Sequence, residues 1–253
     1  MSSQGTSVFI FAHQDDEIGC FHEIEGKIYI GNQVLIFYLT SGSFSGKKNL
    51  IRNNESIKVL SKLGVQKKNI FFIGHLTNSP DGVLVDNIDT VFNIMLKILR
   101  KATIENLYFM AWEGGHQDHD AAHYIGVKLA IERNILDKAF QFPLYNGAGL
   151  PGILFKLFSP LALNGQPIVK KIPWRKRLHY ISLCFLYKSQ IKTWIGLFPF
   201  YAAHHIFHGT QILQKISMAR VKEKPHFGYL LYERRGFCNY IEFKRKLRIT
   251  VRT

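Results

Sequence analysis

Two short clusters of histidine and carboxylate residues are the groups in this chain best suited to chemistry. His13-Gln14-Asp15-Asp16-Glu17 follows the apolar run Val8–Ala12, and His116-Gln117-Asp118-His119 follows the run Asn106–Trp112. Imidazole and carboxylate groups are costly to bury unless they are paired or bind a metal ion. Either cluster alone could be a solvated turn in which an aspartate caps a helix. Because both clusters follow buried strands, we expect them to form one metal site at the carboxyl edge of a sheet.

The donor atoms of these clusters suit Zn2+ or another divalent metal ion. His13 and Asp16 from the first cluster, with His119 from the second, would supply three nitrogen and oxygen ligands. Three protein ligands with one open position is the arrangement of catalytic zinc sites. The chain has no Cys-x-x-Cys pair that would favour a thiolate site instead. Asp15 would stand beside the activated water and take its proton.

The second cluster allows two interpretations. In the first, His116 lies one helical turn before His119 and faces the same cavity, while Asp118 holds His116 in one tautomer or keeps it protonated. In the second, His119 and His123 form the paired ligands of a zinc-protease helix. This alternative leaves the first cluster without a role. A further group, His204, His205 and His208, could bind metal but is better explained as part of a partly buried aromatic segment.

Alternating strand and helix patterns must position these residues. Four nearly all-apolar runs predict strands that are buried on both faces: 8–12, 33–40, 69–74 and 106–112. Helical patterns lie between and after them, at about 16–28, 50–63, 89–101 and 118–133. This alternation predicts an α/β fold, a Rossmann-like, doubly wound and mostly parallel sheet with right-handed crossovers.

The second part of the chain, residues 141–253, is less regular. It contains a Pro- and Gly-rich segment at 142–155 that predicts a long loop, and a segment at 180–194 that can be helical. Near the end, residues 238–251 almost alternate between apolar and charged side chains, which predicts a terminal edge strand. We therefore expect a single domain over 1–253, with both clusters in an α/β core at 1–140 and an irregular basic extension that ends in a strand.

The net charge of +15 is concentrated in that extension. Residues 1–140 carry 14 Lys/Arg and 15 Asp/Glu, whereas residues 141–253 carry 19 Lys/Arg and only 3 Asp/Glu. Such a field favours an anionic partner, although it could also simply keep the surface soluble. No DNA- or RNA-binding motif is visible, so we expect no nucleic-acid partner.

The cysteines and the apolar segments bear on the compartment. Three widely spaced cysteines fit a reducing environment and argue against a disulfide framework. The first apolar run is too short for a signal peptide. The segment 193–214 has no Lys, Arg, Asp or Glu and is long enough to span a bilayer, but its histidines and Pro199 favour a buried or interfacial segment. We expect a cytoplasmic protein, with peripheral contact on the inner face of the membrane left open.

Both clusters resemble signature motifs of the PIG-L/LmbE-like zinc-dependent N-deacetylases. The first is similar to that family's Ala-His-Pro-Asp-Asp-Glu motif, with Gln14 in place of Pro, and the second to its His-Pro-Asp-His motif, with Gln117 in place of Pro. The resemblance continues in order along the chain to about residue 190. Its weaker matches are Leu39–Gly42, Arg52 with Glu55, Leu63–Val65 and Tyr187–Gln190.

The resemblance implies a role for each matching residue. It implies zinc held by His13, Asp16 and His119, with Asp15 as the general base and then the acid toward the leaving amine. It further implies that His116 stabilises the oxyanion and is oriented by Asp118, and that Arg52 contacts the substrate.

The implied reaction is hydrolysis of the N-acetyl group of an N-acetylglucosamine conjugate of a lipid, an inositol or another small molecule. From the basic second part we add our own expectation of a phosphate-bearing substrate, such as a lipid-linked sugar. Aromatic residues interleaved with the bases at 174–177 and near 194–201 would suit peripheral membrane contact. A non-catalytic protein on the same fold that binds polyanions or sugar conjugates is the alternative.

Overall fold

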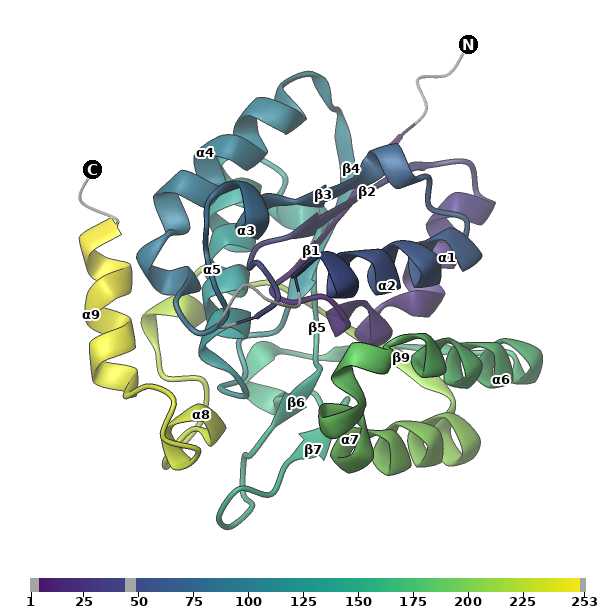
Figure 1. The fold of residues 1–253 in the computed structure, drawn as a ribbon. Coiled ribbons are helices and arrows are strands. Elements are labelled where there is room, and N and C mark those ends of the chain that lie inside the picture. The colour runs from purple at the N-terminus through teal and green to yellow at the C-terminus, as the bar shows by residue number, and fades with distance from the viewer. Residues whose placement is uncertain (1–4, 44–48, 251–253) are drawn as a thin grey trace.

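A seven-stranded, mostly parallel sheet forms the centre of the protein (Figure 1). The computed structural model describes residues 5–43 and 49–250. Within these residues the strand order is β3-β2-β1-β4-β5-β9-β8. The first five of these strands run parallel, and β9 and β8 are antiparallel to their neighbours. Their bounds are β1 Thr6–Phe11, β2 Gln33–Tyr38, β3 Ile70–Phe72, β4 Ile104–Met110, β5 Ala139–Phe142, β8 Pro167–Lys171 and β9 Thr210–Lys215.

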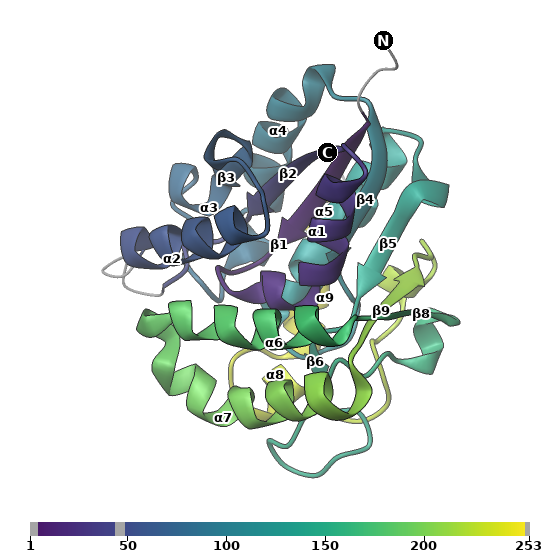
Figure 2. The same ribbon diagram turned by 90° about the vertical axis from the view of Figure 1, so that its right-hand side faces the viewer.

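Helices cover both faces of the sheet, as its all-apolar strands require. Every residue of β1 is buried, and β2 is buried after its first residue. Figures 1 and 2 show α1 (Phe21–Tyr29) and α2 (Asn49–Lys62) on one face, and α4 (Ile88–Ile98) and α5 (Gln117–Glu132) on the other. The predicted doubly wound sheet is confirmed. The first predicted helix is divided into a 3-10 turn at Asp16–Gly19 and α1, and the third strand leads into the short helix α3 (Ile73–Leu76).

The second part of the chain extends the same sheet. β9 pairs with β5, and β8 pairs with β9. The segment 142–155, predicted to be a loop, contains the two-residue strand β6 (Tyr145–Asn146), which pairs with β7 (Lys156–Leu157). Between β8 and β9 the chain forms two helices, α6 (Trp174–Leu183) and α7 (Ile191–Ala203). The segment 180–194, predicted to be helical, includes the end of α6, two 3-10 turns at Cys184–Leu186 and Lys188–Gln190, and the start of α7, and the chain turns back between the two helices.

The predicted strand over 238–251 is wrong, because most of this range forms a helix. After the short helix α8 (Leu231–Arg234), α9 spans Tyr240–Thr250, and Val251 lies outside the described residues. The apolar residues Phe243 and Leu247 fit a helix as well as a strand, since residues four apart share one helical face. Both are buried, and the Phe243 ring lies 6.3 Å from that of Trp112. The sequence pattern fits a helix and a strand about equally well, and packing against the core selected the helix.

No helix in the described ranges is long and apolar enough to cross a membrane. The uncharged segment 193–214 is divided among α7, a π-helical turn at His204–His208 and β9. Trp194, Tyr201 and His205 in this segment are buried, whereas Ile195 and Phe207 are exposed.

Candidate metal centre

Both predicted clusters lie at the carboxyl edge of the sheet, on neighbouring strands. β1 ends at Phe11 and leads into the first cluster, and β4 ends at Met110 and leads into the loop before α5. The two strands are adjacent and parallel, so their ends meet. β1 also pairs with β2 on its other side, which makes this the point where the strand order reverses. Doubly wound sheets bind ligands in the crevice at such a point.

The three predicted ligands bring their donor atoms together. His13 Nδ1 lies 3.3 Å from His119 Nε2, and His119 Nε2 lies 3.2 Å from Asp16 Oδ1. The third separation, from His13 Nδ1 to Asp16 Oδ2, is 3.4 Å. Ligand atoms about 2.1 Å from a tetrahedral zinc ion lie about 3.4 Å from one another. The two imidazoles and the carboxylate therefore have both the chemistry and the spacing that a zinc ion requires.

Electrostatics at this site favours a bound cation. Burial raises the pKa of the Asp16 carboxyl, but His119 and His13 outweigh burial and hold it well below its ordinary value. Burial lowers the pKa of His13, but Asp81, Asp16 and Asp118 outweigh it and raise that pKa well above its ordinary value. The carboxylates thus stabilise positive charge at the position where the three donor atoms converge.

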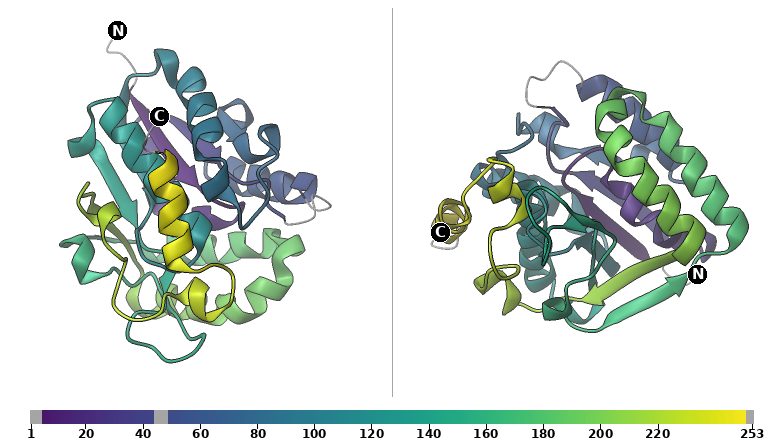
Figure 3. Two further views of the ribbon diagram at one scale, coloured as in Figure 1. Left: turned by 90° about the vertical axis from the view of Figure 1, so that its left-hand side faces the viewer. Right: turned by 90° about the horizontal axis from the view of Figure 1, so that it is seen from below.

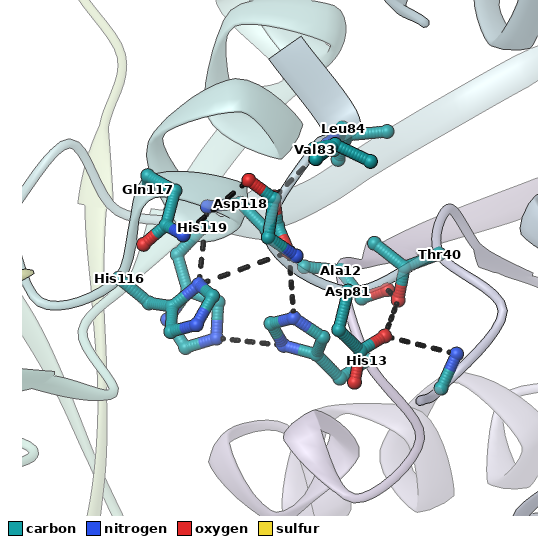
Figure 4. Close-up of polar contacts among 12 residues, drawn as sticks. Ala12, His13, Thr40, Asp81, Val83, Leu84, His116, Gln117, Asp118 and His119 are labelled. Carbon is teal, nitrogen blue, oxygen red and sulfur yellow. Dashed lines mark hydrogen bonds and ion pairs between the residues drawn. The ribbon is translucent and has the colours of Figure 1, made fainter. Parts of the chain in front are cut away.

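Asp118 lies closer to His13 than to His116, the residue that the sequence-based interpretation places beside it. Figure 4 shows the His13 ring between the Asp118 carboxylate and the His119 ring, with His13 Nε2 3.0 Å from Asp118 Oδ2. The same carboxylate is 3.9 Å from His116 Nδ1. It is fixed in place by two backbone N–H groups, of Gly82 at 2.5 Å and Leu84 at 3.1 Å. Because His13 Nε2 faces a carboxylate, it would keep its proton when a metal ion binds, and Nδ1 would then be the nitrogen that binds the metal.

His116 ends the loop and begins α5. Its Nδ1 accepts a hydrogen bond from the backbone N–H of Asp118 at 3.1 Å, so it acts as the N-cap of the helix. Burial, together with the positive charge of His13, lowers the pKa of His116 to about 3. The imidazole is therefore neutral, and its proton must be on Nε2. That N–H can donate to an oxygen atom of a ligand.

Asp15 lies beside the three ligands without joining them. It is a non-glycine residue with φ of 107°, a strained conformation of the kind found at functional sites. Its N–H donates to Glu17 Oε2 at 2.9 Å, which helps to hold this conformation. Burial, opposed by Arg52, raises the pKa of the Asp15 carboxyl to about 8. A carboxyl with a pKa near neutrality can take up and release a proton in turn.

Arg52, from α2, is buried and forms several contacts with the first cluster and the segments beside it. Its guanidinium donates to the backbone oxygen of Gln14 at 2.6 Å and to that of Gly42, and lies 3.2 Å from Asp81 Oδ2 and 3.4 Å from Asp15 Oδ1. Its donors are thus largely committed to the protein. A role in orienting Asp15 fits this geometry better than the predicted direct contact with substrate, which stays a prediction.

Two other acidic residues, neither of which had a role in the sequence-based prediction, support the ligands and Arg52. Asp81 accepts hydrogen bonds from Thr40 Oγ1 at 2.8 Å and from the Gly42 N–H at 3.0 Å (Figure 4). Glu17 is buried and accepts from the Tyr187 hydroxyl at 2.8 Å. Asp81 lies in the turn Pro80-Asp81-Gly82, and this turn chemistry was the only signal in the sequence that pointed to it.

The second part of the chain supplies an aromatic and cationic wall beside the ligands. The Tyr145 ring lies 5.2 Å from that of His119, and the Phe237 ring lies 5.6 Å from that of His116. The Arg235 guanidinium lies over two rings, 5.9 Å from the centre of Tyr145 and 5.6 Å from that of Phe155. No ion pair is recorded between Arg235 and any acidic residue of the described chain. The excess of basic residues pointed to this region, but not to Arg235 itself.

The remaining candidate histidines lie outside the metal groups found in the described chain. His123 Nδ1 is 2.8 Å from the backbone oxygen of Met110, and the ring packs on Phe109 of the sheet. A zinc-protease pair of His119 and His123 is therefore not formed. His204 Nε2 lies 2.7 Å from the backbone oxygen of Thr210, and the neighbouring His205 faces the backbone of its own helix.

A protein-family model covers the part of the chain that carries both clusters. Residues 8–130 match the model described as PIG-L: GlcNAc-PI de-N-acetylase. Residues 8–130 are a PIG-L family domain. This confirms the predicted family, which consists of deacetylases that act on amino sugars. No curated protein matches the chain by sequence.

Solved structures share the fold of this chain. The zinc-inhibited form of teicoplanin deacetylase Orf2 has a TM-score of 0.62 at 16% identity, over 84% of this chain and 99% of that one. N,N'-diacetylchitobiose deacetylase from Pyrococcus horikoshii has a TM-score of 0.58 at 19% identity, over 85% and 84% of the two chains. GalB, a 4-carboxy-2-hydroxymuconate hydratase from Pseudomonas putida KT2440, has a TM-score of 0.55 at 14% identity, over 85% and 96%. Because one of these is a hydratase, the shared fold alone does not select the reaction.

Proposed function

We propose that this chain is a metal-dependent hydrolase that removes the N-acetyl group from an N-acetylglucosamine-type amino sugar conjugate. One observation carries the proposal: the donor atoms of His13, Asp16 and His119 converge at 3.2–3.4 Å, with the Asp15 carboxyl beside them. The match to a family of amino-sugar deacetylases supports this reaction over others on the same fold. The cofactor is Zn2+ or another divalent metal ion held by the three ligands.

The proton path follows from the position of Asp15. The chemistry that zinc supplies when bound is Lewis acidity, which polarises a carbonyl group and makes water more acidic. Asp15 removes a proton from the attacking water, whose oxygen forms a bond to the acetyl carbon. The same carboxyl then gives that proton to the amine nitrogen as the carbon–nitrogen bond breaks. The products are acetate and the free amino sugar.

His116 and Asp118 have separate tasks in this scheme. The neutral His116 imidazole donates its Nε2 proton in a hydrogen bond to the acetyl oxygen as negative charge develops there. Asp118 accepts a hydrogen bond from His13 Nε2 and so presents Nδ1 of His13 to the metal. Arg52 holds Asp15 in place and is also the proposed contact to the sugar.

The substrate is proposed to carry an anionic group, such as a phosphate that links the sugar to a lipid. Arg235 supports this, because its guanidinium lies on the aromatic wall of the site and has no acidic partner among the residues that the structure describes. The whole chain would act as one deacetylase domain, in which 1–140 holds the metal and 141–253 binds the substrate or a surface. The three free cysteines agree with a cytoplasmic setting, and a lipid-linked substrate would bring the protein to the inner face of the membrane.

The decisive experiment combines metal analysis with measurement of acetate release. Wild-type protein and Asp15→Asn are incubated with neutral, phosphate-bearing and inositol-linked conjugates of N-acetylglucosamine. We expect about one metal ion for each chain in both proteins. Asp15→Asn should release acetate about 100- to 10,000-fold more slowly, the range for loss of a general base. Asp137→Asn, which changes an exposed aspartate far from the site, is the matched control and should behave as wild type.

The alternative of a non-catalytic sugar-conjugate or polyanion binder predicts a different result. Such a protein would bind one of the conjugates but release no acetate from any of them. Absence of bound metal in wild-type protein purified with added zinc would contradict the proposed function directly.

A further inference from the structure

Helices α6 and α7, with the turn 184–190 that joins them, form a hairpin on the outside of the molecule (Figure 3). One side of each helix packs on the protein. Tyr180 and Leu183 of α6 are buried, as are Trp194 and Tyr201 of α7. A helix packed in this way on a water-soluble surface normally carries polar residues on its outer side.

The outer side of this hairpin is apolar instead. Trp174, Leu178 and Phe185 share one face of α6 and its continuation, and their side chains are 52%, 52% and 64% exposed. Ile191 and Ile195 are four residues apart on α7 and are 63% and 74% exposed. An exposed apolar surface of this kind is typical of an interaction site.

The exposed apolar residues of α6 and those of α7 meet, so they form one continuous surface. The ring centre of Phe185 lies 5.1 Å from that of Phe198 on α7. Phe198 is one turn from Ile195, and Phe185 is the last of the exposed apolar residues of α6 and its continuation. We call Trp174, Leu178, Phe185, Ile191, Ile195 and Phe198 the apolar face.

Cations surround the apolar face, and the second part of the chain offers no acidic residue near it. Arg175, Lys188 and Lys192 are exposed, and no ion pair is recorded for them in the described chain. No Asp or Glu occurs in the sequence between Lys138 and Lys222. Lys176 does form an ion pair, with Glu25 of α1 at 2.9 Å. The partner of this surface must therefore be both apolar and negatively charged.

A second copy of this chain does not meet these requirements. A two-fold interface would place the apolar face of one copy on that of another. It would also bring Arg175, Lys188 and Lys192 of both copies together without a compensating carboxylate. An anionic lipid surface satisfies both requirements at once, because large apolar side chains enter the headgroup region while lysines and arginines contact the lipid phosphates.

We propose that the α6–α7 hairpin docks the protein on a membrane surface rich in anionic phospholipid through this apolar face. The inference deepens the proposed function, since a lipid-linked substrate would be met at such a surface. An aromatic line connects the hairpin to the metal ligands. The ring centre of Phe200 in α7 lies 5.6 Å from that of Phe155, which lies 5.9 Å from that of Tyr145. The Tyr145 ring centre lies in turn 5.2 Å from that of His119. Docking through α6 and α7 would thus bring the wall of the site close to the lipid.

Vesicle binding tests the inference without any substrate. Wild-type protein is mixed with vesicles of phosphatidylcholine alone or of phosphatidylcholine with phosphatidylserine, and the bound fraction is measured by co-sedimentation. The chain has three tryptophans, of which Trp112 and Trp194 are buried and Trp174 is 52% exposed on the apolar face. We expect binding to the anionic vesicles, accompanied by a blue shift of Trp174 fluorescence.

Two double variants separate the apolar and electrostatic contributions. Ile191→Ser with Ile195→Ser, and Lys188→Glu with Lys192→Glu, should each weaken partitioning to anionic vesicles about 10-fold or more. The matched controls change exposed residues at the opposite edge of the sheet and should partition as wild type. They are Tyr29→Ser with Ile30→Ser, which are 89% and 64% exposed, and Lys67→Glu with Lys68→Glu.

The possible results distinguish membrane docking from self-association and from failure of the proposed function. Equal binding to neutral and anionic vesicles, or equal binding by all four variants, would overturn the inference. A wild-type dimer that dissociates on Ile191→Ser with Ile195→Ser would overturn it in favour of a second copy. These variants should still release acetate from a water-soluble conjugate at the wild-type rate. Vesicle binding that persists while no conjugate is hydrolysed would sustain docking and reject the proposed function instead.

Discussion

The His13 imidazole and the Asp118 carboxylate meet across 105 residues of sequence, with Nε2 and Oδ2 3.0 Å apart. Each comes from a different cluster, and each strand end delivers one of them to the same point. Backbone N–H groups of Gly82 and Leu84 fix the carboxylate, so the orientation of the His13 ring depends on a third segment as well. The clusters therefore form one site, in which we propose that Asp118 supports the ligand His13 rather than binding the metal itself.

Replacing Asp118 by Asn should weaken metal binding while leaving the three ligands in place. Loss of a carboxylate partner of a metal-bound histidine lowers affinity about 10- to 100-fold. Competition with a chromogenic chelator measures this change. Asp89→Asn on α4, which removes a surface ion pair with Lys128, is the control. Equal zinc affinity in wild type and Asp118→Asn would show that the His13–Asp118 contact has no part in metal binding.

Arg235→Gln should discriminate between anionic and neutral conjugates. A hydrogen bond to a charged group contributes about 1.5–3 kcal/mol, so KM for a phosphate-bearing conjugate should rise about 10- to 100-fold with little change in kcat. KM for a neutral conjugate should change much less. The exposed Arg100, changed to Gln, is the control. The same rise in KM for both conjugates would argue against an anion at this position.

Ser189→Ala should destabilise the junction between α2 and the hairpin. The Ser189 hydroxyl donates to Glu55 Oε2 at 2.6 Å, and its N–H donates to Oε1 at 2.8 Å. Only the first of these hydrogen bonds is lost in the variant, so the free energy of unfolding should fall by about 1–2 kcal/mol. Urea denaturation measures the difference. Ser182→Ala, which removes an exposed hydroxyl on α6, should change stability much less.

Glu113 should make folding stability depend on pH. The side chain is fully buried beyond β4, and burial raises its pKa from 4.5 to about 7 despite hydrogen bonds from Leu144, Asn146 and Tyr145. A carboxyl with a raised pKa in the folded state favours folding while it is protonated. Its contribution is therefore full below pH 4.5 and is lost as the pH rises to about 7.

Glu113→Gln removes this titration. The free energy of unfolding of the variant should therefore increase relative to that of wild type as the pH rises. The gain should be about 3 kcal/mol, since one pKa unit corresponds to about 1.4 kcal/mol. Urea unfolding of both proteins between pH 4 and 8 isolates the contribution of Glu113 from other titrating groups. Parallel stability profiles for the two proteins would show that the Glu113 pKa is not raised.

Local pattern in the sequence was sufficient to predict the parallel sheet and its two clusters. The all-apolar runs that form β1 and β4 cannot be exposed, and the residues after them are too polar to be buried without a partner. The rule that parallel strands end at one edge then brings His13, Asp16 and His119 together. These three did converge, because the strand order places β4 directly beside β1.

Only the tertiary structure decided how the remaining residues are used. The sequence could not show that Asp118 faces His13, that Asp81 holds Arg52, or that Arg235 lies on Tyr145, because each contact joins segments from different elements. It also failed at the C-terminus, where Phe243 and Leu247 fit two periodicities and packing on Trp112 selected the helix. Composition and spacing thus determined the kind of chemistry and its place on the sheet. The orientation of each side chain required long-range packing, which a local pattern does not contain.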